Sequence, residues 1–118
     1  MSRAFIILVW GLLCAPTLAS AHAFLERAHP PAGAEIHDPP ATVSLTFSEP
    51  VEPRYTSIEV QDATGKRIDT GEKSASGGGK TVSLGLPRLP PGRYRVLWHA
   101  TSVDTHKTEG HYIFEVLP

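Results

Sequence analysis

Polar and apolar residues alternate along much of the chain after residue 41, with the period of two that a half-buried β-strand produces. The clearest case is residues 42–48, where Val43, Leu45 and Phe47 fall on one face. Four later runs continue this alternation, and we predict that all of them are strands with the apolar face inward: residues 56–61, 80–86, 92–101 and 111–117. We also predict that residues 22–28 form an edge strand.

Proline and glycine separate the predicted strands and exclude long helices. Pro-Pro pairs follow residues 29, 38 and 89, and no run of three helical turns carries an apolar stripe. Residues 71–80 (GEKSASGGGK) have the composition of a flexible loop. Short strands joined by turns are typical of an all-β antiparallel sandwich or a small barrel, and we expect about seven strands.

The first 21 residues differ from the rest of the chain. Arg3 precedes an apolar run at residues 4–15, and the segment ends in the small residues Ala19-Ser20-Ala21. This order is typical of a secretory signal peptide, so we predict cleavage after Ala21 and export of a domain covering residues 22–118. The alternative is an uncleaved membrane anchor, but the apolar run is shorter than the roughly 20 residues that span a bilayer.

Composition and charge narrow the possible functions. A chain of 118 residues suits one small domain, and a formal net charge of -1 without a Lys/Arg-rich block argues against nucleic-acid binding. The single cysteine, Cys14, lies in the apolar run, so the exported domain has no disulfide, thiolate ligand or cysteine nucleophile. Walker-type phosphate loops and Gly-x-Ser-x-Gly motifs are absent from the sequence. The six histidines are the remaining chemical signal.

Cleavage after Ala21 would give one of these histidines a second ligand group. His22 would become the first residue, and its α-amine and imidazole Nδ1 would together form a chelate. An α-amine titrates at about pH 8, so a metal displaces its proton readily at neutral pH. Two nitrogens from one residue suit a metal that prefers a tetragonal plane of nitrogen and oxygen ligands, chiefly Cu(II).

Asp104 and His106 are candidates for the other half of such a site. In an extended segment, residues two apart project to the same side, so a carboxylate oxygen and an imidazole nitrogen reach one point. With His22 they supply three nitrogens and one oxygen, and no Cys or Met remains after cleavage to favour Cu(I). The alternative is that Asp104 and His106 belong to a solvated turn, and that a histidine follows the cleavage site by chance.

Three stretches of the exported domain carry a family resemblance: HAFLERAHPPAG at residues 22–33, LTFSEPVEP at residues 45–53, and PPGRYRVLWHATSVDTHKTEGHYIFEV at residues 90–116. They resemble the CopC family of periplasmic copper-binding proteins, which act in bacterial copper resistance and copper import. The resemblance extends over essentially the whole exported domain. It implies a Greek-key β-sandwich of cupredoxin-like or immunoglobulin-like topology.

The resemblance also implies a ligand set. One Cu(II) per chain is then held by the amine and imidazole of His22, by Asp104 and by His106. Glu49, in a Phe-Ser-Glu motif, corresponds to a residue close to the site in the family, and we expect it beside the metal or as a weak axial contact. His111, which opens the last predicted strand, is a further candidate for a hydrogen bond near the site.

The resemblance implies a function and partners as well. Some family members carry a Met-rich loop for Cu(I), but residues 57–76 contain no Met, so the chain is similar to the Cu(II)-only branch. The protein is then periplasmic, not an enzyme, and not embedded in the membrane after cleavage. It sequesters copper or delivers it to a CopD-like inner-membrane copper importer or to other copper-resistance proteins. Two alternatives are a copper-dependent oxygenase, which also uses an N-terminal histidine chelate, and an interaction module that binds no copper.

Overall fold

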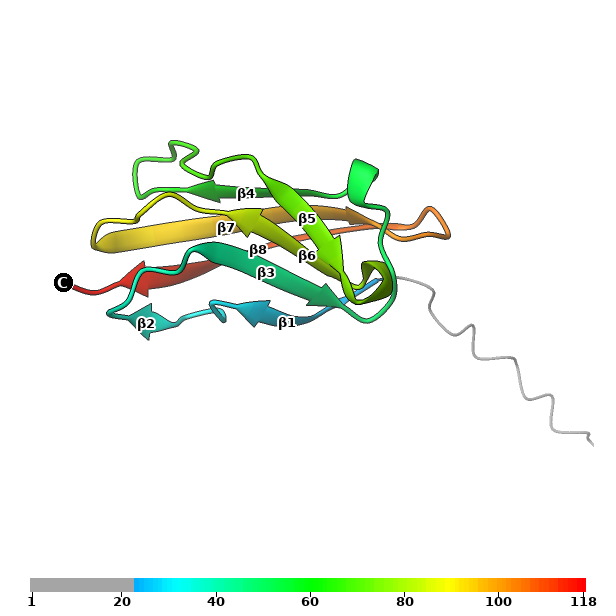
Figure 1. Cartoon of the computed structure of the whole chain (residues 1–118), viewed down its shortest axis with the longest axis horizontal. Helices are drawn as coiled ribbons and strands as arrows, with labels where there is room; N and C mark the ends of the chain where they lie inside the picture. The colour runs from blue at the N-terminus through cyan, green and yellow to red at the C-terminus, as the bar shows by residue number, and fades with distance from the viewer. Residues whose placement is uncertain (1–22) are drawn as a thin grey trace, which may run out of the picture.

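Two four-stranded β-sheets pack face to face in the computed structural model of the chain, which describes residues 23–118 (Figure 1). The first sheet has the order β1-β3-β6-β5, formed by β1 (Leu25–His29), β3 (Thr42–Phe47), β6 (Thr81–Gly85) and β5 (Lys73–Ser76). The second has the order β2-β8-β7-β4, formed by β2 (Glu35–Ile36), β8 (Lys107–Val116), β7 (Gly92–Thr101) and β4 (Ser57–Gln61). The predicted all-β sandwich is confirmed, with eight strands where about seven were expected.

Two N-terminal predictions fall outside this description. The predicted signal peptide at residues 1–21 and the predicted ligand His22 precede the first described residue. Within residues 23–118, the helical segments are the short 3₁₀ turns η1 (Pro53–Tyr55) and η2 (Gly77–Gly79). No helix in this part of the chain is long and apolar enough to cross a membrane.

The apolar rows of the sequence form the core between the two sheets. In the predicted strands from residue 42 onward, every second residue is buried, as the alternation requires. Phe47 of β3 and Trp98 of β7 meet across the two sheets, with ring centroids 5.5 Å apart at an interplanar angle of 73°. Such edge-to-face contacts add to the hydrophobic burial of large rings. The core rows that the sequence predicted are confirmed: Val43, Leu45, Phe47, Val82, Leu84, Leu86, Tyr94, Val96, Trp98, Ala100, Tyr112, Phe114 and Val116.

The prediction of a flexible loop at residues 71–80 is wrong, because this segment contains β5 and η2. All four residues of β5 are exposed, so the strand shows no apolar alternation. Its pairing with β6 is antiparallel and depends on the backbone. Lys73 also anchors the segment, since its Nζ donates hydrogen bonds of 2.6 Å each to the carbonyls of Pro53 and Thr56.

The last strand begins at Lys107, four residues before the start that the alternation predicts. The pattern fails at Gly110, which faces inward but has no side chain. Trp98, directly opposite on β7, fills this space: a Cβ on Gly110 would lie 2.6 Å from its Cζ2 atom. The apolar side chain missing from β8 is therefore supplied by β7.

The β7–β8 hairpin places one turn at the end of the sandwich. Its ladder runs from Gly92 opposite Val116 to Thr101 opposite Lys107, so the connection is residues 102–106. Figure 1 shows this turn (orange) and the start of the described chain (blue) at the same end, with the C-terminus at the other end.

Candidate metal centre

Backbone hydrogen bonds close the turn that carries Asp104 and His106. The N–H of Ser102 donates to the carbonyl of His106 over 2.9 Å, and the N–H of Thr105 donates to the carbonyl of Ser102 over 2.9 Å. Thr105 has φ 74°, in the left-handed region that residues other than glycine rarely adopt. The segment is therefore not extended, and the strand geometry invoked to align Asp104 with His106 is wrong.

The turn nevertheless brings these two predicted ligands together. Nδ1 of His106 lies 2.9 Å from Oδ2 of Asp104. Both side chains are partly exposed, at 53 % for His106 and 33 % for Asp104. The left-handed residue between them reverses the backbone, so the two side chains meet on one side of the turn. An imidazole nitrogen and a carboxylate oxygen thus lie next to each other at the surface.

Ser102 holds the second oxygen of this carboxylate. Its hydroxyl donates to Oδ1 of Asp104, and its side chain is buried at 1 % exposure. The hydrogen bond from Ser102, followed by that from His106, lowers the pKa of Asp104 below its ordinary value. The shift favours the ionised form, which is the form that a carboxylate ligand must have.

The start of the described chain is held close to the same turn. The hydroxyl of Thr108 donates a hydrogen bond of 2.8 Å to the carbonyl of Ala23, which is 1 % exposed. Phe24 forms a reciprocal pair with Ser48: its N–H donates to Oγ of Ser48 over 2.9 Å, and its carbonyl accepts from the N–H of Ser48 over 2.8 Å. Ala23 is thus fixed to a residue two positions after His106.

The two further candidates occupy different places. Glu49 is exposed and lies between Ser48, which pairs with Phe24, and Pro50, whose carbonyl accepts a 3.3 Å hydrogen bond from the N–H of Val103 in the turn. Glu49 therefore borders this end of the sandwich. His111 is exposed on β8 opposite Leu97, about 16 Å along the chain from His106 at the rise of an extended strand. The structure does not bring His111 to the turn.

Residues 23–118 supply only part of a metal site. Among them, no group of three or more His, Cys, Asp or Glu side chains lies close enough to hold a metal ion. Asp104 and His106 form a pair, with one nitrogen and one oxygen ligand. The described residues thus supply two candidate ligands at this turn.

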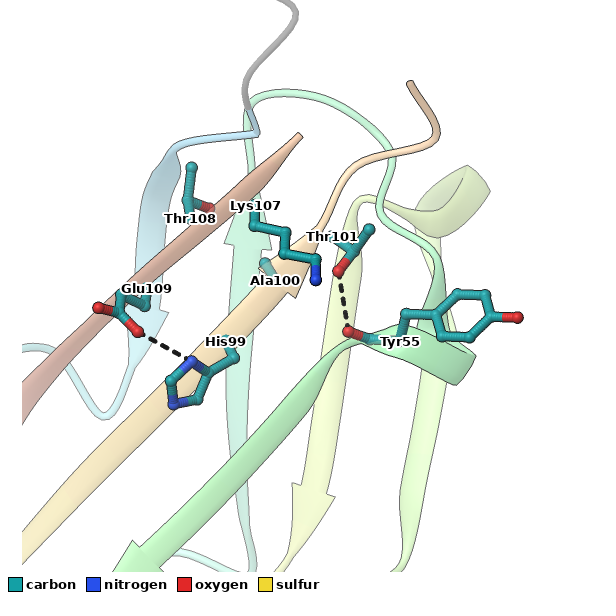
Figure 2. A pocket seen from close by; sticks show the side chains of 7 residues that line it. All are labelled: Tyr55, His99, Ala100, Thr101, Lys107, Thr108 and Glu109. Carbon is teal, nitrogen blue, oxygen red and sulfur yellow. Dashed lines mark hydrogen bonds and ion pairs between the residues drawn. The ribbon is translucent and has the colours of Figure 1, made fainter. Parts of the chain in front are cut away.

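A surface hollow of about 650 Å³ opens beside the turn (Figure 2). In it, Nδ1 of His99 lies 3.0 Å from Oε2 of Glu109, and the two side chains are 65 % and 73 % exposed. Such an exposed pair contributes little to stability. Thr108, which binds the carbonyl of Ala23, also lines the hollow. The hollow therefore extends to the start of the described chain.

Two residues of this region were missed in the sequence, Ser102 and Thr108. A signal existed for Ser102, since it continues the inward row of Tyr94, Val96, Trp98 and Ala100 by one step. A serine at an inward position implies a hydrogen-bond partner, because a buried hydroxyl without one is costly. Thr108 had no comparable signal, because its partner Ala23 is 85 residues away in the chain.

Comparison with known proteins identifies the family. The family model of the CopC domain matches residues 25–117, which include almost the entire described chain. The chain belongs to the CopC family. Protein YobA of Escherichia coli (strain K12) is similar in sequence: it is 35 % identical to this chain over 98 residues, which cover 81 % of this chain and 79 % of YobA.

Two other similarities extend this result. Copper transport protein CutJ of Bacillus subtilis (strain 168) is 34 % identical over 118 residues, covering 98 % of this chain but 22 % of CutJ. The crystal structure of CopC from Methylosinus trichosporium OB3b superimposes with a TM-score of 0.73 and 36 % identity, covering 82 % of this chain and 95 % of that CopC chain. This chain thus corresponds to nearly all of the crystallised CopC chain but to about a fifth of CutJ.

Proposed function

We propose that this CopC-family protein binds one Cu(II) ion per chain in the periplasm. The ligands are the α-amine and imidazole of His22, the carboxylate of Asp104 and an imidazole nitrogen of His106. The single observation that carries this proposal is the hydrogen bond of 2.8 Å from Thr108 to the carbonyl of Ala23. It holds the residue after His22 beside the turn that presents Asp104 and His106.

Covalent geometry supports the missing half of the site. Consecutive Cα atoms are about 3.8 Å apart, so the residue before Ala23 cannot lie far from it. Because Ala23 is hydrogen-bonded to Thr108, two residues after His106, we expect an amine and an imidazole on that preceding residue to reach the Asp104–His106 pair. Cleavage after Ala21 is required, since an amide nitrogen in an uncleaved chain is a far poorer ligand than an amine.

The available donors fit Cu(II) better than Cu(I). The four ligand atoms are three nitrogens and one oxygen, which suit the tetragonal geometry of Cu(II). Residues 23–118 contain no Cys or Met, the soft ligands that Cu(I) prefers. Asp104 is ionised at neutral pH, as an ordinary carboxyl is, and its hydrogen bonds favour this form further. The described half of the site therefore accepts a divalent cation without first losing a carboxyl proton.

The same arrangement favours storage or transfer of copper over catalysis. A copper oxygenase needs a coordination position open to oxygen, and a carboxylate ligand at Asp104 would occupy one. Ligands held on a rigid sandwich bind tightly, because little ordering remains when the metal arrives. Mild acid protonates the amine and the imidazoles, so the affinity falls as the pH drops. Acidification is thus one route to copper release.

The relative CutJ supports a partner for this protein. This chain corresponds to 22 % of CutJ, which is named as a copper transport protein. In CutJ the CopC-like segment and the remaining chain are covalently joined. We expect the present protein to meet a separate copper-transport protein, such as a CopD-like inner-membrane importer, and to exchange Cu(II) with it.

Mass spectrometry of the exported protein, with and without Cu(II), tests the proposal directly. It should find a chain that begins at His22 and takes up one copper. A chain with one additional residue before His22 lacks the free amine at this position, so its affinity should fall by at least the roughly 10–100-fold that loss of a partner of a metal ligand costs. Affinity is measured by competition with a chelator, and the ligand nitrogens are identified by electron paramagnetic resonance.

Two histidine variants provide a matched control. His106→Ala should lose most of the affinity, whereas His111→Ala should retain it, because His111 is exposed away from the turn. Full affinity in the chain with the additional residue would refute the amine ligand. Robust peroxide production by the copper form with ascorbate would instead favour the oxygenase alternative.

A further inference from the structure

We infer that Ser102 is a positioning residue of the copper site, which holds one oxygen of Asp104 so that the other oxygen meets the metal. This inference rests on the proposed function. Ser102 is almost completely buried, at 1 % exposure. Ser102 therefore lies beneath the surface of the site and does not contact solvent.

The hydroxyl of Ser102 has a defined partner. Its oxygen lies within hydrogen-bond distance of Oδ1 of Asp104 and 3.2 Å from the carbonyl oxygen of His106. A serine hydroxyl donates one proton. The negative charge of the carboxylate assigns this proton to Asp104, because hydrogen bonds to ionised acceptors are the stronger ones.

The backbone of Ser102 is fixed from two sides. It forms an isolated antiparallel bridge with Val51, which is buried. The N–H of Val51 in turn donates a hydrogen bond of 2.9 Å to the carbonyl of Gly79, near the first sheet. On the other side, its N–H donates to the carbonyl of His106. The hydroxyl thus has a rigid base, unlike a hydroxyl on an exposed loop.

The two oxygens of Asp104 consequently have different roles. Oδ1 accepts from Ser102, and Oδ2 lies 2.9 Å from Nδ1 of His106. Without Ser102, a carboxylate that is one-third exposed would rotate about its Cβ–Cγ bond. With Ser102, Oδ2 is the oxygen presented to a cation, and Asp104 binds through a single oxygen. A single carboxylate oxygen is what a plane of three nitrogens and one oxygen needs.

Three variants test this role. Ser102→Ala removes the hydroxyl, and Ser102→Thr keeps it. The control Ser83→Ala removes a partly buried hydroxyl on β6, away from the turn. This hydroxyl lies 2.9 Å from Oγ of Ser44. Loss of a hydrogen-bond partner of a ligand typically costs about 10–100-fold in metal affinity. We expect such a loss for Ser102→Ala, an altered Cu(II) electron paramagnetic resonance spectrum, and at least partial recovery of both in Ser102→Thr. Ser83→Ala should retain the affinity and the spectrum.

A double-variant cycle separates positioning from a purely structural role. If Ser102 acts through Asp104, Ser102→Ala should weaken copper binding little further when Asp104 is already replaced by alanine. Unchanged affinity and spectrum in Ser102→Ala would overturn the inference. It would also be overturned if Ser102→Ala without copper unfolds far more readily than Ser83→Ala, because the role of Ser102 would then be structural. If the natural chain fails to bind Cu(II), the proposed function itself is wrong. If the natural chain binds Cu(II), Asp104→Ala does not bind it, and Ser102→Ala binds it with unchanged affinity, then the inference about Ser102 fails and the proposed function stands.

Discussion

The hydroxyl of Thr108 and the carbonyl of Ala23 are joined by a hydrogen bond of 2.8 Å, although the two residues are 85 positions apart in the chain. This bond connects the start of the described chain to the beginning of the last strand, beside the Asp104–His106 turn. It is therefore the physical link between the two halves of the proposed copper site.

Replacing Thr108 with valine tests this link. Valine has nearly the same shape as threonine but cannot donate to Ala23, so the start of the chain becomes less well held. A hydrogen bond of this kind contributes about 0.5–1.5 kcal/mol. We expect Cu(II) affinity to fall by about threefold to tenfold, measured by chelator competition. Thr81→Val is the matched control, because it removes a threonine hydroxyl that pairs with Thr46 and should leave affinity unchanged.

Asp69 should make the stability of the protein sensitive to acid. Its side chain is 0 % exposed. Burial by itself raises the pKa of this carboxyl. The carboxylate accepts hydrogen bonds from the side chain of Arg67 and from the N–H groups of Val60 and Gly71. These hydrogen bonds outweigh burial, so the pKa lies below its ordinary value. The ionised form is thus favoured in the folded state.

The sign of the pH effect follows from this shift. A carboxyl whose pKa is lower in the folded than in the unfolded state stabilises the fold above the unfolded pKa, and this contribution is lost as the pH falls through the folded pKa. Urea unfolding between pH 7 and pH 2 should therefore show a smaller loss of stability in Asp69→Asn than in the natural chain. Asp38→Asn, at an exposed position, should follow the natural chain; an equal pH dependence in both variants would contradict the prediction.

Gly110→Ala should destabilise the fold. Its Cβ would lie 2.6 Å from Cζ2 and 2.9 Å from Cε2 of Trp98, a ring that is 7 % exposed and packed against Phe47. Overpacking of this kind costs about 1–3 kcal/mol. The loss is measured by urea unfolding, with the fluorescence of Trp98 as the probe. His111→Ala, at the adjacent exposed position, should change the free energy of unfolding much less.

Tyr112→Phe should leave stability unchanged or increase it. Tyr112 is 8 % exposed, and its hydroxyl has no hydrogen-bond partner among the described residues. Burial alone raises the pKa of this phenol well above its ordinary value. Leaving a buried hydroxyl unpaired costs about 1–3 kcal/mol, so removing it relieves this cost.

Tyr94→Phe is the matched comparison for this prediction. Tyr94 is also buried, but its hydroxyl donates to the carbonyl of Pro90 over 2.5 Å. This variant leaves the carbonyl without its partner, so it should lower the melting temperature. Equal melting temperatures for Tyr94→Phe and Tyr112→Phe would refute this account of the two hydroxyls.

The sequence was most informative where burial alternates along a strand. The inward rows of β3, β7 and β8 could be predicted because each strand has one face in the core. The strand β5 could not, since all its side chains are exposed and it is held by backbone pairing. The early start of β8 was hidden for a related reason, because the space at Gly110 is filled by Trp98 from another strand.

In the candidate site, too, local sequence patterns predicted one part, and contacts between distant segments determine the other. The two-residue spacing of Asp104 and His106 predicted that they lie together, although a left-handed turn at Thr105 achieves this in place of an extended strand. The approach of Ala23 to Thr108 had no local signal, because it arises from the packing of segments distant in the chain. The copper site of His22, Asp104 and His106 stays a prediction until its metal binding is measured.

The strands β1 and β2 lie consecutively in the chain but belong to different sheets. Each is the outer strand of its own sheet: β1 covers β3, and β2 covers β8. Loss of this short segment would uncover the backbone donors and acceptors of two longer strands at once, and open strand edges recruit other chains. The segment that follows the proposed copper ligand thus also protects the sandwich from edge-to-edge aggregation, so a truncation that extends past the ligand into β1 and β2 would damage solubility as well.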